Sequence, residues 1–137
     1  DCLQRLAKTD IKVAVHLINS LPYETTDMML ESAKALATLP IHALKLHMLH
    51  IMQDTQMAIE YENQPFPLLS LEDYVDIVIR QLEVLPPEMI IQRLTGDGVK
   101  ELLIAPTWTL HKVNVLNTID KEMKRRNTWQ GRLYSKS

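Results

Sequence analysis

Cysteine is almost absent from this sequence: Cys2 is the single one among 137 residues. A disulfide needs two cysteines, so the chain cannot close one within itself. Such a composition is typical of a reducing compartment, and we expect a cytoplasmic protein. Cys2 lies outside every predicted strand end, and we interpret it as a free thiol without a functional role.

Glycine is also scarce, and long hydrophobic runs are missing. The three glycines, Gly96, Gly98 and Gly131, cannot build the glycine-rich phosphate loop of a P-loop or a dinucleotide-binding fold. No apolar run approaches the roughly 18–20 residues of a membrane span, and no signal-peptide pattern is present. We therefore expect no membrane association. The chain begins at Asp1 rather than at methionine, which we interpret as the start of a processed or truncated product.

Charge of one sign is not in excess, because the net charge is −2 at pH 7. A general attraction to polyanions is therefore not expected. The exception is local: Lys121, Lys124, Arg125 and Arg126 gather near the end of the last predicted helix. Such a run is typical of a solvated helix end, where cations complement the helix dipole. The alternative is that, with Trp129 close by, it contacts RNA phosphates and a base.

What the chain does offer is an alternation of strands and helices in three β–α units. Strands are predicted at 11–18, 43–51 and 89–94, where β-branched and apolar residues gather. Capping residues and apolar stripes predict one helix that stops at Leu39-Pro40, a short one at about 55–62, a long one between Ser70 and Pro86, and a last one at about 108–126. The apolar face of the last helix is expected to contain Val113, Leu116, Ile119 and Met123.

This order of elements predicts an α/β fold with a parallel sheet and right-handed crossovers. A closed eight-stranded barrel takes about 200–250 residues, so we expect a partial parallel (β/α) barrel of about three β–α units in one domain, 1–137. Its sheet would have unpaired edges, and we expect it to dock on the rest of its own barrel or on a second copy. Functional groups in such sheets gather at the carboxyl ends of the strands, here 18–24, 49–55 and 93–97.

The first of these ends carries a resemblance to a known family. The sequence His-Leu-Ile-Asn-Ser-Leu-Pro-Tyr-Glu at 16–24 resembles the HLI-x-G-L-P-x-E stretch of radical S-adenosylmethionine (radical SAM) proteins. Further segments are similar, in the expected order, to the C-terminal part of a subfamily related to the elongator catalytic subunit: 41–51, 81–88, 91–98, 103–106, 115–120 and 128–131. The resemblance implies the C-terminal half of a TIM-type barrel. The N-terminal half, outside this chain, would hold a 4Fe-4S cluster through a C-x3-C-x2-C loop, which a chain with one cysteine lacks.

The resemblance also implies positions for a cofactor site. Ile18 would lie against the adenine of S-adenosylmethionine, Ser20 stands where glycine is common, and Glu24 would anchor the turn. His47 and Leu49 would come near the adenine edge. On pattern alone, Ile18 is a core residue and Glu24 a carboxylate near the start of a helix, so these assignments depend on the resemblance. We expect no catalytic residue within this chain.

Strand-end position singles out two further polar residues and one histidine pair. Arg93 is placed to hold a substrate anion and Asp97 to orient it. The alternative is that Asp97-Gly98 simply forms a turn and that Arg93 is a strand residue that makes a salt bridge. His47 and His50 form a His-x-x-His pattern, but residues three apart on a strand point to opposite faces. We therefore expect no metal site here.

Three functional interpretations follow. The leading one is the C-terminal portion of a radical SAM enzyme that contributes to the S-adenosylmethionine and substrate site. The resemblance implies an enzyme that cleaves the cofactor reductively and removes a hydrogen atom from its substrate, a tRNA wobble uridine. This chain alone is expected to be inactive. The second is a non-catalytic module that binds a ligand or a protein and self-associates, favoured by Ser20 and by the missing cluster loop. The third is an RNA-binding element built on the basic last helix, which the net charge disfavours.

Overall fold

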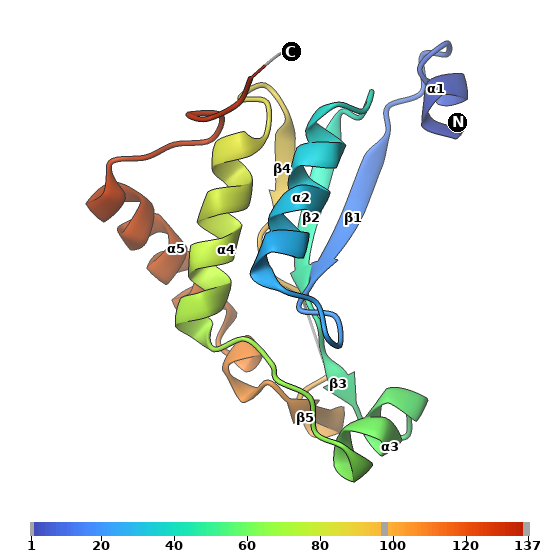
Figure 1. The fold of residues 1–137 in the computed structure, drawn as a ribbon, viewed down its shortest axis with the longest axis vertical. Helices are drawn as coiled ribbons and strands as arrows, with labels where there is room; N and C mark the ends of the chain where they lie inside the picture. Colours follow the sequence, from blue (N-terminus) through green and yellow to red (C-terminus); the bar gives the residue numbers. More distant parts are fainter. Residues whose placement is uncertain (1, 97–98, 136–137) are drawn as a thin grey trace.

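A computed structural model describes residues 2–96 and 99–135, and its main feature is a three-stranded parallel sheet (Figure 1). The sheet has the order β1-β2-β4. Its strands are β1 (Ala14–Asn19), β2 (Ala43–Met48) and β4 (Ile90–Arg93). The predicted α/β class with three parallel strands is confirmed, and the described strands do not close into a barrel.

Two of the strands are shorter than their sequence patterns. The first begins at Ala14, three residues after Ile11, whose side chain is exposed. The second ends at Met48 rather than Ile51. There the backbone N–H of Leu49 donates a hydrogen bond to the Asn19 carbonyl at 3.1 Å. The apolar pattern continues past the point where β2 leaves the sheet, so it could not mark that end.

Three helices, α2 (Thr26–Ala37), α4 (Leu71–Val84) and α5 (Lys112–Arg126), cover one face of the sheet (Figure 1). Helix α2 packs beside α4, and α5 lies against α4. The short α1 (Cys2–Leu6) precedes β1. Side-chain caps start α2 and α4, in agreement with the capping residues before each helix: Thr25 Oγ1 accepts from Met28 N–H, and Ser70 Oγ accepts from Asp73 N–H. No helix within the described residues combines the length and the apolar character of a membrane span.

The main core lies between this helical layer and the sheet. It contains buried side chains of β2, α4 and α5: Leu44, Leu46, Met48, Tyr74, Val75, Val78, Ile79, Leu82, Leu85, Val115 and Ile119. On α5 the buried residues are Val115 and Ile119, whereas Val113 is 71% exposed and Leu116 is 37% exposed. The predicted apolar face of that helix was therefore wrong at two of its four positions.

The opposite face of the sheet carries no helix among the described residues, and we call it the open face. Alternation along the strands places on it Ala14, His16, Ile18, Lys45, His47, Ile90 and Gln92. Ile18 is 43% exposed and Ile90 is 62% exposed. An apolar surface on a sheet face is normally covered in a complete domain.

A small lobe lies beyond the carboxyl end of the sheet (Figure 1). The sequence predicted its short helix, at about 55–62, but not its two-stranded sheet. We define the lobe by β3 (Ile51–Met52), α3 (Gln56–Asn63) and β5 (Leu103–Ala105), with β3 and β5 antiparallel. Two 3-10 turns flank β5, at Lys100–Leu102 and Thr107–Leu110. The lobe has its own core of Leu49, Ile51, Ala58 and Phe66.

The C-terminal segment folds back over the end of α4. The N–H of Gly131 donates to the Leu82 carbonyl at 3.0 Å, and Arg132 pairs with the largely buried Glu83 at 2.8 Å. Gly131 has a φ of 87°, and a Cβ there would lie 2.8 Å from Cδ of Pro87. Two of the segments that carried the family resemblance, 81–88 and 128–131, therefore contact each other.

Candidate functional site

The carboxyl ends of β1, β2 and β4 meet at one edge of the sheet, next to the small lobe (Figure 1). This edge and the adjoining open face form the candidate site. In α/β sheets such edges gather ligands because the loops that leave parallel strands converge there.

The turn after β1 contains a serine in an unusual backbone conformation. Ser20 has a φ of 70° and is buried, and its Oγ accepts a hydrogen bond from Leu69 N–H at 3.4 Å. Glycine adopts this left-handed region without the Cβ clash that other residues suffer. The structure thus gives a physical reason for the glycine that is common at this position of the motif.

Glu24 closes the same turn. Its backbone N–H donates to the Leu21 carbonyl at 2.9 Å, and its Oε1 accepts from the Leu21 N–H at 3.3 Å. Two hydrogen bonds thus join Leu21 and Glu24, one through the backbone and one through the carboxylate. They hold the residues from 21 to 24 in a closed loop. Any role of Glu24 toward a cofactor stays a prediction.

Ile18 and His47 lie side by side on the open face, because they are register partners in β1 and β2. The ring of His47 also stacks on that of His16, with 5.8 Å between the ring centroids and 24° between the planes. Together they form a flat, partly apolar surface at the end of the sheet. Leu49 is different, since its side chain is 8% exposed and packs in the core of the small lobe.

The two histidines of the His-x-x-His pattern converge instead of pointing to opposite faces. A Cβ built on Gly96 would lie 2.8 Å from His47 Nδ1 and 3.1 Å from His50 Cε1. The prediction from strand alternation was wrong because β2 ends at Met48, so His50 is outside the strand. Among the residues that the structure describes, no group of three or more His, Cys, Asp and Glu side chains is arranged to hold a metal ion.

Arg93 is the last residue of β4 and pairs in register with Lys45 after a shift in the β2–β4 ladder. It lines a groove of about 460 Å³ between β4 and α5, together with Lys112 and Gln130. Arg93 and Lys112 are the cationic side chains of its lining, which otherwise consists largely of apolar residues. Asp97, the other candidate for a substrate contact, lies outside the described residues.

A buried amide pair at the end of β1 was missed by the sequence reading. Asn19 Nδ2 donates to Gln81 Oε1, and Gln81 Nε2 donates to Asn19 Oδ1, both at 2.8 Å. Gln81 Nε2 also donates to the Met29 carbonyl at 3.0 Å. These bonds tie the strand that leads into the site to both α2 and α4. The available signal was a polar residue on an otherwise apolar face: Leu17 lies two residues before Asn19 in the strand, and Ile77 and Val78 lie four and three residues before Gln81 in the helix.

The basic run on α5 is largely neutralised by carboxylates. Lys124 pairs with Asp120 at 3.0 Å, and Arg126 pairs with Asp76 of α4 at 2.9 Å. Hydrogen bonds from Arg125 and then from Arg126 lower the pKa of Glu122 to about 2. This arrangement favours the explanation of the basic run as a solvated helix end. It leaves less positive charge for RNA phosphates than the sequence suggests.

The three-stranded parallel sheet with helices α2, α4 and α5 on one face defines an α/β fold. The model of the radical SAM C-terminal domain matches residues 41–125, and the chain belongs to that family. The predicted resemblance to radical SAM proteins of the elongator-catalytic-subunit type is therefore confirmed.

Individual relatives agree with this membership. The chain is 45% identical over 134 residues to Uncharacterized protein YtqA of Bacillus subtilis. This match covers 98% of this chain and 42% of YtqA. It is 35% identical over 125 residues to Uncharacterized protein MJ0486 of Methanocaldococcus jannaschii, covering 90% and 39%. The chain thus spans about two fifths of the length of these relatives.

Among solved structures, the chain matches archaeal Methanocaldococcus infernus Elp3 with an N-terminal deletion. The TM-score is 0.76 at 13% identity, over 93% of this chain and 29% of that one. At this identity the match establishes a shared fold, and the matched region is about three tenths of the Elp3 chain.

Proposed function

We propose that this chain forms one wall of the S-adenosylmethionine and substrate site of a radical SAM enzyme, and that the whole enzyme modifies a tRNA wobble uridine in the cytoplasm. The observation that carries the proposal is the open face: Ile18 stays 43% exposed although it lies in a strand that is packed on its other side. In this family the cofactor and its iron–sulfur cluster supply the radical chemistry, and the residues of this chain would bind and orient.

The residues present fit the adenine end of the cofactor. Ile18 beside the imidazole of His47 offers a flat, partly apolar surface, which suits one face of a purine. Ser20 keeps the turn after β1 tight through its left-handed backbone. Backbone groups of that turn can therefore approach the adenine. A 4Fe-4S cluster does not fit here, because the chain has one cysteine. We place the cluster ligands in an N-terminal half of the barrel, which would pair with the unpaired edge of β1.

The tRNA substrate is proposed from the resemblance of segments such as 41–51 and 91–98 to the elongator-related subfamily. Arg93 is in register with Lys45 on the open face, and a guanidinium is the side chain that best matches the oxygens of an anionic substrate group. Arg93, and Asp97 beyond it, would hold the substrate while Ile18 and His47 contact the cofactor.

The test uses the full-length protein that contains this chain, with its cluster reconstituted, and measures the Kd of S-adenosylmethionine by equilibrium dialysis. Ile18→Asp places a charge against the expected purine, and we expect the Kd to rise about tenfold or more, which corresponds to about 1.4 kcal/mol. Ile59→Asp is the matched control, because Ile59 is 54% exposed on α3, and its Kd should stay within about twofold. An unchanged Kd for Ile18→Asp would contradict the proposal.

The alternative function, a self-associating binding module, is favoured by one observation: within the described residues, β1 and β4 pair only with β2 and leave their outer edges open. Sedimentation of the natural protein separates the two functions. A stable dimer without affinity for S-adenosylmethionine would favour the module. A monomer that binds the cofactor would favour the enzyme.

A further inference from the structure

Tyr23, in the turn after β1, combines a strained backbone with an exposed aromatic side chain. Its φ is 64°, in the left-handed region that favours glycine, yet its side chain is 76% exposed. A bulky residue in this conformation persists only where the surroundings impose it, and such residues cluster at binding and catalytic sites. Burial cannot be the reason to keep a tyrosine here, because most of its surface remains in water.

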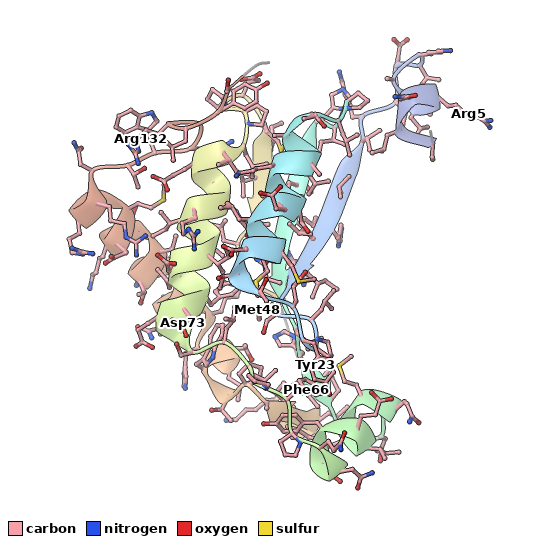
Figure 2. All side chains as sticks on the ribbon, viewed as in Figure 1. Arg5, Tyr23, Met48, Phe66, Asp73 and Arg132 are labelled. Atoms are coloured by element: carbon pink, nitrogen blue, oxygen red, sulfur yellow. The ribbon has the colours of Figure 1, made fainter. Side chains whose placement is uncertain are left out.

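The ring of Tyr23 is supported from behind by two further aromatic rings. Its centroid lies 6.2 Å from that of Phe66 with a tilt of 54°, and Phe66 makes an edge-to-face contact with Tyr61 at 5.3 Å. Phe66 is 6% exposed and belongs to the core of the small lobe. Figure 2 shows Tyr23 and Phe66 next to each other where the carboxyl end of the sheet meets that lobe. One side of Tyr23 is thus fixed by packing and the other is open.

A hollow of about 280 Å³ opens at this ring, lined by Pro22, Tyr23, Glu60, Asn63, Gln64 and Phe66. This volume lies just below the roughly 300–1,000 Å³ of ligand pockets, and it suits one ring system rather than a large ligand. Besides the hydroxyl of Tyr23, the polar side chains of the lining are two carboxamides and one carboxylate, with no lysine or arginine among them. Such groups recognise a neutral hydrogen-bonding edge, whereas a phosphate would need cations or converging N–H groups.

We propose that this hollow binds a single nucleobase, with the base stacked on Tyr23 and its edge hydrogen-bonded by Asn63, Gln64 or Glu60. Stacking on an exposed aromatic ring is the usual way in which proteins hold an unpaired base, because every base has a π-face. The carboxamides present donors and acceptors together, which matches the mixed edge of a base better than the side of an aromatic amino acid.

The inference deepens the proposed function and rests on it for the origin of the base. The turn that carries Tyr23 also carries Ser20 and Glu24, so the hollow adjoins the expected cofactor site. A base of the RNA substrate, extruded from its helix, would be held beside the adenine end of the cofactor. Base binding itself needs no cofactor and can be measured separately.

The experiment uses the full-length protein that contains this chain and two probes: a fluorescent single-stranded RNA followed by anisotropy, and free uridine followed by saturation-transfer NMR. Tyr23→Gly removes the ring and relieves the backbone strain. We expect the RNA Kd to rise about tenfold and the uridine signal to disappear, while the thermal midpoint rises. Loss of binding together with a gain of stability cannot come from misfolding. Tyr23→Phe keeps the ring and should keep the affinity within about threefold.

Asn127→Gly is the matched control. Asn127 also has a left-handed backbone, with a φ of 53° at the end of α5, but it does not line the hollow. Its substitution should leave binding of both probes unchanged. Unchanged RNA and uridine binding in Tyr23→Gly would overturn the inference, as would binding of N-acetyltyrosinamide in place of uridine. If Tyr23→Gly loses RNA but the wild-type protein fails to bind S-adenosylmethionine, the base site stands and the proposed function fails.

Discussion

The reciprocal amide pair between Asn19 and Gln81 allows a quantitative test of how the end of β1 is held. Both side chains are essentially inaccessible to solvent, at 1% and 0% exposure. Asn19→Leu and Gln81→Met replace each amide by an apolar group of similar size. Each single substitution leaves buried polar atoms of the other residue without their partner, and each such atom costs about 1–3 kcal/mol.

The three hydrogen bonds predict an asymmetry between the two single variants. In Asn19→Leu, Gln81 Nε2 keeps its bond to the Met29 carbonyl and only Oε1 loses its partner. We expect a loss of about 1–3 kcal/mol in the free energy of unfolding. In Gln81→Met, both Oδ1 and Nδ2 of Asn19 lose their bonds, so the loss should be about twice as large.

The double variant removes both amides, and no side-chain amide atom of the pair is left buried without a partner. The two single losses come from three buried atoms without partners, and none of these atoms remains in the double variant. We therefore expect it to be more stable than the sum of the single effects predicts, with a coupling of at least about 3 kcal/mol. The assay is urea unfolding followed by circular dichroism at constant m-value. Additivity of the two single effects within about 0.5 kcal/mol would refute the reasoning, as would a smaller loss for Gln81→Met than for Asn19→Leu.

Two further predictions concern the C-terminal part. Gly131→Ala should lower the free energy of unfolding by about 1–3 kcal/mol, because φ is 87° and the new Cβ would lie 2.8 Å from Pro87 Cδ; a midpoint of urea unfolding equal to that of the wild type would contradict this. Hydrogen bonds from Arg125 and Arg126 lower the pKa of Glu122 from 4.5 to about 2 on folding. The Glu122 carboxylate therefore stabilises the fold above pH 4.5, and this contribution is lost as the pH falls toward 2. In Glu122→Gln the thermal midpoint should therefore fall less over that pH range, and an identical acid profile in both proteins would argue against the assignment.

The candidate site could be predicted in part because local sequence and local structure coincide there. The turn after β1 was identified from residues 16–24, and its Ser20 and Glu24 do shape that turn. The aromatic contact between Tyr23 and Phe66 could not be predicted, because it joins residues of two separate segments. Leu49 shows the same limit: its strand-end position suggested a ligand contact, and its packing in the small lobe depends on residues far along the chain.

Where the second strand ends was also beyond the sequence pattern. The apolar run continues to Ile51, but β2 leaves the sheet at Met48 and β3 then pairs with β5, about 50 residues later. Both segments of that second sheet are two or three residues long, too short for a periodic signal. The convergence of His47 and His50 on Gly96 follows from this break.

By itself the sequence determined the α/β class, the order of the main strands and helices, the helix caps and the family, because apolar periodicity, capping residues and short motifs are local properties of the chain. Tertiary structure alone decided where β2 ends, which face of α5 is buried, how Asn19 meets Gln81, and which side chains surround Tyr23. Each of these depends on contacts between residues distant in sequence, whose free energy exists only when the segments are already packed together.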